Sequence, residues 1–218
     1  MAIRKVARMG HPVLRKVARK LSLDEIKTPA FKQLLADMVE TMHEYGGIGL
    51  AAPQIHESVS VAIIEYQEGE SRYEDENKDD EDSAHISTEK STNDKPEKHK
   101  DALTEMPLSV FVNATITVLD EKEQGYWEGC LSVPEIRGLV YRPRKIRVDY
   151  QDQEGKKKSL VAEGFLATVF QHELDHIAGT LFVDRIRNEP GKTQIAFTEE
   201  YSRYHVPHED SDVGELAD

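Results

Sequence analysis

The sequence predicts an α+β domain. Residues 28–45 and 163–178 carry the periodicity of helices, whereas runs typical of strands dominate the region between them. Two of these runs, at 139–150 and 157–161, enclose the turn-forming residues 152–155 and predict a β-hairpin. The helices and the strands are therefore expected to occupy separate parts of one domain.

Length and composition indicate a single domain over residues 1–218. Hydrophobic residues make up 38% of the chain, which is low enough that part of it is expected outside the core. We expect neither a membrane span nor secretion, because no run of about 18 apolar residues exists and no apolar signal region follows the first residues. The single cysteine excludes an internal disulfide and fits a reducing compartment.

The net charge of −13 is concentrated in two segments. Residues 65–105 hold 15 acidic and 6 basic residues, and residues 208–218 hold 5 acidic residues and no Lys or Arg, so the rest of the chain carries a net charge of +1. A polar segment buries too little apolar surface to offset the entropy of ordering it. We expect a mobile insertion at about 67–105 and a frayed tail at about 205–218. No basic stripe indicates direct recognition of nucleic acid.

The first helix is predicted at residues 28–45. Thr28 suits the N-cap and Pro29 suits the first helical position. One apolar face follows helical spacing through Phe31, Leu34, Leu35, Met38, Val39, Met42 and Tyr45. The pair Gly46-Gly47 supplies a C-terminal stop.

Strand patterns rich in β-branched residues follow at 59–66 and 111–119. The glycine-bearing loop at 47–54 allows close approach of another backbone. Its glycine spacing formally matches a dinucleotide fingerprint, but that motif must follow a strand and open a helix, so we reject this interpretation. Residues 195–204 are compatible with a strand or with a short helix.

The second helix is predicted at residues 163–178, with Gly179 as its stop. Its apolar residues cover most of the circumference, as in a buried helix; they are Phe165, Leu166, Val169, Phe170, Leu174 and Ile177. The same helix carries a polar segment, His172-Glu173-Leu174-Asp175-His176. Burying these charges is costly unless something organises them.

The two histidines are four residues apart, so their imidazoles point to one side of the helix and can share a divalent metal. Glu173 is placed to act as a base on metal-bound water. A thiolate from Cys130 would complete three ligands and leave one position open, which is the pattern of catalytic sites. Two alternatives for the cysteine are a small buried hydrophobe and a nucleophile activated by one histidine, and the second leaves His176 unexplained.

Three segments together resemble the signature motifs of peptide deformylases, in the same order. They are Gly47-Ile48-Gly49-Leu50-Ala51-Ala52-Pro53-Gln54, Glu128-Gly129-Cys130-Leu131-Ser132 and Gln171-His172-Glu173-Leu174-Asp175-His176. The resemblance spans about residues 1–66 and 107–187. It implies mostly antiparallel sheets around a central buried helix that carries the histidine motif, with one further helix near the N-terminus. It also implies a bacterial cytoplasmic hydrolase that releases formate from the N-terminal formyl-methionine of newly synthesised polypeptides.

The resemblance implies a role for each motif residue. Cys130, His172 and His176 would hold the metal, with water in the fourth position. Glu173 would act as general base and then as general acid for the attack of that water on the formyl carbon. The oxyanion donors would be the Gln54 amide and the Leu131 N–H. A charge network that orients the ligands would comprise Glu128, Arg142 and Asp175.

The resemblance also implies an extended peptide along strand-like edges. Ile48, Gly49 and Gly129 match positions that contact its backbone, and Arg137 matches a position near its downstream residues. The methionine pocket would be lined by Ile48, Glu128, Phe165, Thr168, Val169 and His172. Thr168 stands where an aliphatic residue is more usual, so we expect a slightly more polar or roomier wall.

The resemblance favours Fe²⁺ as the active metal, with Zn²⁺, Ni²⁺ or Co²⁺ as substitutes, all of which this ligand set suits. The partners would be formyl-methionyl peptides of nascent chains, and a transient association with the ribosome is compatible with that substrate. The C-terminal segment does not resemble the long terminal helix of the commonest bacterial type, so ribosome contact through that helix is not carried over.

Two other functions are compatible with the histidine motif. A general metallopeptidase would usually take its third ligand downstream, where the candidates are His205 and His208. A catalytically inactive, metal-stabilised relative would need neither Glu173 nor Gln54.

Overall fold

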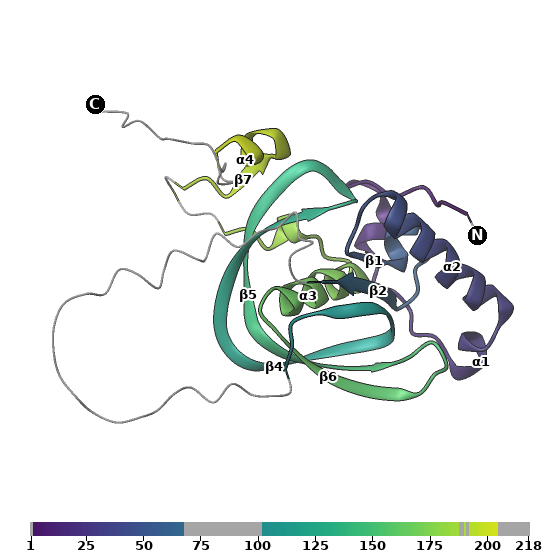
Figure 1. Cartoon of the computed structure of the whole chain (residues 1–218). Coiled ribbons are helices and arrows are strands. Elements are labelled where there is room, and N and C mark those ends of the chain that lie inside the picture. The colour runs from purple at the N-terminus through teal and green to yellow at the C-terminus, as the bar shows by residue number, and fades with distance from the viewer. Residues whose placement is uncertain (1, 68–101, 188–189, 191, 205–218) are drawn as a thin grey trace, which may run out of the picture.

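The computed structural model describes residues 2–67, 102–187, 190 and 192–204. In this part of the chain seven strands form one sheet in the order β1-β2-β4-β5-β6-β3, and β7 pairs with β5 beside this path. The strands are β1 (Gly49–Ala51), β2 (Val61–Tyr66), β3 (Ala102–Leu103), β4 (Met106–Cys130), β5 (Val133–Gln151), β6 (Lys157–Glu163) and β7 (Ile195–Phe197). The helices are α1 (Leu23–Ile26), α2 (Pro29–Glu44), α3 (Phe165–Ile177) and α4 (Thr198–Tyr204). Figure 1 shows α3 enclosed by the strands, with α2 outside them. The α+β fold with mostly antiparallel pairing and a central helix is confirmed.

The hairpin of β4 and β5 is the largest feature of the sheet. It pairs from Val112↔Gln151 to Cys130↔Val133, with register shifts that allow the long strands to bend over α3 (Figure 1). The predicted strand at 111–119 is therefore only part of β4. Residues 120–124 are polar on both faces, which removes the alternating pattern, and their strand structure comes from pairing with β5.

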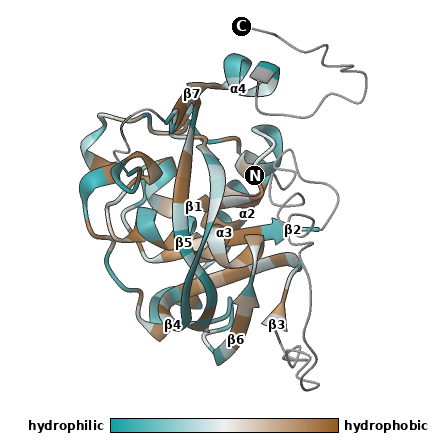
Figure 2. Ribbon diagram, turned by 90° about the vertical axis from the view of Figure 1, so that its left-hand side faces the viewer, coloured by the Kyte–Doolittle hydropathy of each residue, from teal (hydrophilic) through white to brown (hydrophobic). Residues whose placement is uncertain are grey.

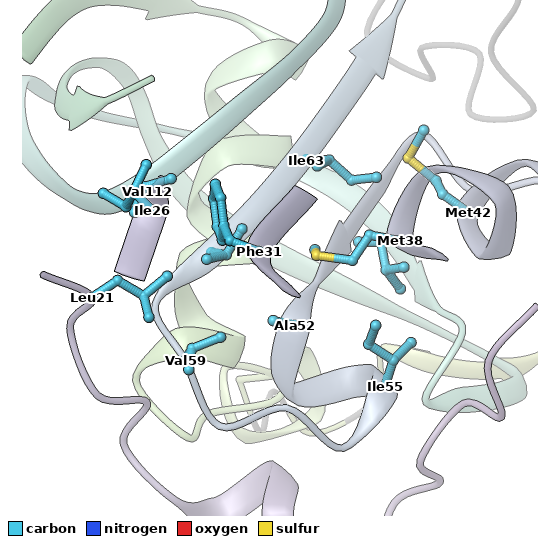
Figure 3. Close-up of a cluster of buried hydrophobic side chains, with 12 residues drawn as sticks. Leu21, Ile26, Phe31, Met38, Met42, Ala52, Ile55, Val59, Ile63 and Val112 are labelled. Carbon is cyan, nitrogen blue, oxygen red and sulfur yellow. The ribbon is translucent and has the colours of Figure 1, made fainter. Parts of the chain in front are cut away.

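Helix α2 begins where the sequence predicts. Thr28 is its N-cap and accepts a hydrogen bond from the Phe31 N–H at 3.2 Å. Its apolar face packs into a cluster with β1, β2 and the short helical turn Ala52–Ile55, as Figure 3 shows. Met38 and Met42 are fully buried there. This packing fixes the glycine-bearing loop at 47–54, which supplies one side of the candidate site.

Helix α3 is the buried helix that the sequence predicts. It starts after Gly164, which adopts a left-handed φ of 67°, and Gly179 follows it with a φ of 77°. Leu166 and Phe170 are fully buried against the sheet, together with Phe111. A side chain at Gly179 would collide with the Arg15 backbone at 2.9 Å, so the turn after α3 requires glycine. One side of α3 thus belongs to the core, and the other carries the histidine motif.

The C-terminal residues form both of the structures considered for them, because β7 leads directly into α4. The predicted insertion at 67–105 ends too late, since Ala102–Leu103 form β3 and pair in parallel with β6. Residues 68–101 and the tail at 205–218 lie outside the described residues. No helix in the described part is long and apolar enough to cross a membrane.

Candidate metal centre and peptide cleft

A sulfur and two imidazoles converge where β4 ends against α3. The potential ligand atoms of Cys130, His172 and His176 all lie within 4.8 Å of one another. The Cys130 Sγ is 3.2 Å from the His176 Nε2, and the two imidazole rings have centroids 5.1 Å apart. The structure therefore brings together the three residues that the sequence proposes as ligands, from two elements more than forty residues apart.

Charges around this cluster favour a thiolate and a fixed imidazole. Although burial alone would raise it, His176 and His172 hold the pKa of the Cys130 thiol well below its usual range. The Glu128 carboxylate lies 2.7 Å from the His172 Nδ1, which leaves Nε2 to face the cluster. Burial would also raise the pKa of Glu128, but hydrogen bonds with His172 and Arg142 lower it to about 2. The cluster thus offers a thiolate sulfur and two imidazole nitrogens, which is a donor set suited to a divalent cation.

A buried ion network supports the cluster from behind. Arg142 donates to Glu128 at 2.6 and 3.0 Å and to Asp175 at 2.8 Å. Arg185 also donates to Asp175, at 2.6 and 3.1 Å. The structure therefore assembles the three network residues proposed from the sequence and adds Arg185. The only sequence signal for Arg185 was a basic residue after the helix. Its contact with Asp175 depends on how the chain turns back after Gly179.

Glu173 lies beside the cluster and is 4% exposed. Its Oε2 is buried without a hydrogen-bond partner among the described residues. Burial raises the pKa of this carboxyl to about 7, against the lowering effect of the two histidines. A Cβ at Gly49 would lie 2.5 Å from the Glu173 Oε1, so the glycine leaves the space that this carboxylate fills. The group can exchange a proton near neutral pH.

Gln54 is oriented by its own loop. Its Oε1 accepts a hydrogen bond from the Ala51 N–H at 2.8 Å. The Nε2 consequently faces the cluster, 3.5 Å from the Cys130 Sγ and 3.3 Å from the Ser132 Oγ. Leu131 lies between these two residues, and its carbonyl accepts a hydrogen bond from Arg8 at 3.2 Å. No role is predicted from the sequence for Arg8 or for the buried Ser132.

A cleft of about 210 Å³ opens above the cluster. Every residue that the sequence proposes for substrate contact lines it: Ile48, Gly49, Glu128, Gly129, Arg137, Phe165, Thr168 and Val169. Gln54, Cys130, Leu131, His172 and Glu173 line it as well. Three proposed site residues are buried and do not line the cleft: His176, Arg142 and Asp175. Gly47, from the predicted glycine-bearing loop, lines the cleft too. Residues not anticipated from the sequence also contribute, namely Tyr45, Gly46, Val133, Pro134, Glu135, Ile136 and Thr198.

Two details describe the walls of this cleft. The Thr168 hydroxyl accepts a hydrogen bond at 3.3 Å from Gln124, which does not line the cleft and also donates to the Gly164 carbonyl at 2.6 Å. The polar atom at this position therefore has a protein partner outside the cleft. Arg137 lies directly over Gly129, where any side chain would collide with its guanidinium.

The chain is similar to known proteins over most of its length. The family described as Polypeptide deformylase matches residues 3–191. A peptide deformylase of Leptospira biflexa is 36% identical over 188 residues, covering 86% of this chain and 90% of that one. A class I type b peptide deformylase from Acinetobacter baumannii, solved with Met-Ala-Ser bound, is 31% identical with a TM-score of 0.67, covering 85% of this chain and 99% of that one. A peptide deformylase structure from Thermotoga maritima is 29% identical with a TM-score of 0.65, covering 86% of this chain and all of that one.

Proposed function

The chain belongs to the polypeptide deformylase family and is a hydrolase that removes the N-terminal formyl group from new polypeptides, and we propose that Cys130, His172, His176 and Glu173 carry this reaction. One observation supports these assignments best: a thiolate and two imidazoles meet beside a buried carboxyl, Glu173, whose pKa is raised to about 7. Cys130, His172 and Glu173 line one cleft, and His176 is buried next to them.

The three converging residues fit a divalent metal. One sulfur and two nitrogen donors suit iron, zinc, cobalt or nickel, and three protein ligands are the pattern of a catalytic site. We propose Fe²⁺ as the active metal, with the others as substitutes, on the basis of the family. A metal bound here would supply activation of water and withdrawal of charge from a carbonyl oxygen. Glu128 contributes by holding the His172 ring in one tautomer.

Glu173 would perform the proton transfers. Its carboxylate takes a proton from the attacking water and later gives it to the departing amine, so that the C–N bond breaks and formate leaves. A pKa of about 7 suits both steps at neutral pH. The space beside Gly49 holds this carboxylate near the cluster.

The oxyanion that develops on the formyl group would be stabilised by N–H donors. The Gln54 Nε2 is aimed at the cluster because its Oε1 is bound by Ala51. We assign the second donor to the backbone N–H of Leu131, the residue that follows the thiolate. Donors fixed in advance of the reaction need no reorientation as charge develops.

The cleft would orient the peptide. Ile48, Gly49 and Gly129 offer backbone close to its path, as in addition of a strand to a sheet edge. The methionine side chain would occupy the part of the cleft formed by α3, which Phe165, Thr168 and Val169 line. Residues downstream of the methionine would pass Arg137.

Formate release from formyl-Met-Ala-Ser tests this proposal. The iron-loaded protein should release formate, lose this activity with a chelator and recover it when metal is added back. Glu173→Gln should lower kcat at least about a hundredfold, in line with general acid–base contributions, while metal content stays stoichiometric. Glu44→Gln is a matched control, because Glu44 is exposed and does not line the cleft.

Two results would contradict the assignments. Unchanged formate release in metal-loaded Glu173→Gln would remove the proposed role of the carboxyl. Cleavage of unformylated peptides at internal bonds, without formate release, would favour a general metallopeptidase instead.

A further inference from the structure

The segment formed by β7 and α4 lies beyond residues 3–191, which the family matches. It nevertheless joins the sheet beside the cleft, since β7 pairs with β5 from Ile136↔Phe197 to Gly138↔Ile195. The Leu139 N–H also donates to the Gln194 carbonyl at 2.9 Å. Figure 1 shows β7 and α4 beside the closed end of the β4–β5 hairpin. A strand and a helix that follow the matched residues therefore stand at the rim of the candidate site.

The segment is anchored on the strand that ends in the cysteine. Tyr201 of α4 packs against Trp127 of β4 with ring centroids 5.2 Å apart, and the two residues are 6% and 7% exposed. Trp127 precedes Cys130 by three residues. Two buried aromatic rings in contact resist displacement, because separating them exposes a large apolar area. The position of α4 is thus fixed relative to the cluster.

Thr198, the first residue of α4, lines the cleft and is half-buried. Ala196 pairs with Arg137, so both side chains are on the face of the sheet where Arg137 covers Gly129. The side chains of Ile195 and Phe197 point to the opposite face of the sheet, and both are exposed. Figure 2 shows β7 as hydrophobic beside a largely hydrophilic α4. The segment therefore presents Thr198, and not its apolar residues, to the cleft.

We propose that Thr198, held in place by β7 and α4, is a specificity-determining residue that contacts the formylated peptide downstream of its methionine. The inference rests on the proposed function, because it needs the methionine side chain in the part of the cleft formed by α3. An extended peptide advances about 3.3 Å per residue, so later residues travel outward past Arg137 and reach the rim. Contacts made there favour long peptides over short ones, since a dipeptide does not extend that far.

The test compares two substrates in one protein. Formate release is measured from formyl-Met-Ala and from formyl-Met-Ala-Ser-Ala by metal-loaded wild type, Thr198→Trp and Thr193→Trp. Thr193 is a matched control, because it is an exposed threonine two residues before β7 and does not line the cleft. The ratio of the two kcat/KM values is the readout. It does not depend on how much of a variant is folded, since inactive protein lowers both values equally.

We expect Thr198→Trp to lower kcat/KM for the tetrapeptide about tenfold, mainly through KM. The kcat/KM for the dipeptide should change less than about twofold. A tenfold effect corresponds to the loss of a single good contact. Thr193→Trp should leave the ratio unchanged. An unchanged ratio in Thr198→Trp, or an equal change in both tryptophan variants, would overturn the inference. Wild type that deformylates neither peptide would instead overturn the proposed function, and this inference with it.

Discussion

Replacing Arg142 by methionine should damage both stability and the metal centre. Arg142 is 4% exposed and is the shared partner of Glu128 and Asp175, which are 5% and 8% exposed. Methionine keeps much of the apolar stem but leaves two buried carboxylates with less compensation. Removing one partner of a buried ion pair costs about 3–5 kcal/mol, and Arg185 still compensates part of the charge on Asp175. We therefore expect about 3 kcal/mol of destabilisation.

The same variant should weaken metal retention, because Glu128 would no longer be held against the His172 Nδ1. Loss of such supporting contacts typically lowers metal affinity or activity about 10–100-fold. Urea unfolding gives the stability change, and metal content after dialysis against a graded chelator gives the affinity change.

Arg144→Met is the matched control for this experiment. Arg144 is on the same strand, two residues further along, and pairs with Asp120 at the surface, where the two side chains are 42% and 33% exposed. A pair of this kind contributes about 0–1 kcal/mol. If Arg142→Met unfolded at the wild-type urea concentration with unchanged metal content, the network would have neither of the roles that its geometry suggests.

Two further predictions use local geometry. Gly49→Ala places a methyl group 2.5 Å from the Glu173 Oε1, so the carboxylate must shift. The kcat for formate release should therefore fall about a hundredfold with little change in KM. A wild-type kcat in this variant would refute the prediction. Asp37 is a buried carboxyl. Burial alone would raise its pKa, but hydrogen bonds from Gln33, Arg4 and the Ala2 N–H lower that pKa below its usual value. Its contribution to stability is present above the unfolded pKa of about 4 and is lost as pH falls through the folded value. The urea midpoint of wild type should therefore approach that of Asp37→Asn as the pH is lowered below 4, and a constant difference would contradict the shift.

The elements that the sequence predicted well are those whose signals are local. Two adjacent residues, Thr28 and Pro29, mark the start of α2. The apolar periodicity that predicts α3 lies within the helix itself. The long strand β4 was only partly predicted, because residues 120–124 have no strand pattern of their own and depend on pairing with a strand some twenty residues later. The same reason applies to β3, whose two residues pair with β6 across the sheet.

The candidate site shows a similar division. The motifs contain the residues that converge in the cleft, because each motif is a continuous segment on one element. Arg185 and Thr198 were missed because neither stands in such a segment. Arg185 reaches Asp175 through a turn that a glycine permits, and Thr198 reaches the cleft through the pairing of β7 with β5. Contacts of this kind depend on the return path of the chain, which local patterns do not specify.

Metal removal should destabilise the whole domain, since α3 belongs both to the core and to the site. Phe170 is fully buried on one side of α3, while His172 and His176 face Cys130 on the other. Without a cation, the negative charge of the Cys130 thiolate is compensated by a proton on His172, whose pKa is raised. Burial opposes the charged form of both groups. A metal at about a thousand times its dissociation constant adds about 4 kcal/mol to the free energy of unfolding, provided that the unfolded chain binds it weakly. Chelation should therefore lower the urea midpoint, and stoichiometric metal should restore it. An identical midpoint after verified metal loss would mean that the packing of α3 is independent of the centre it carries.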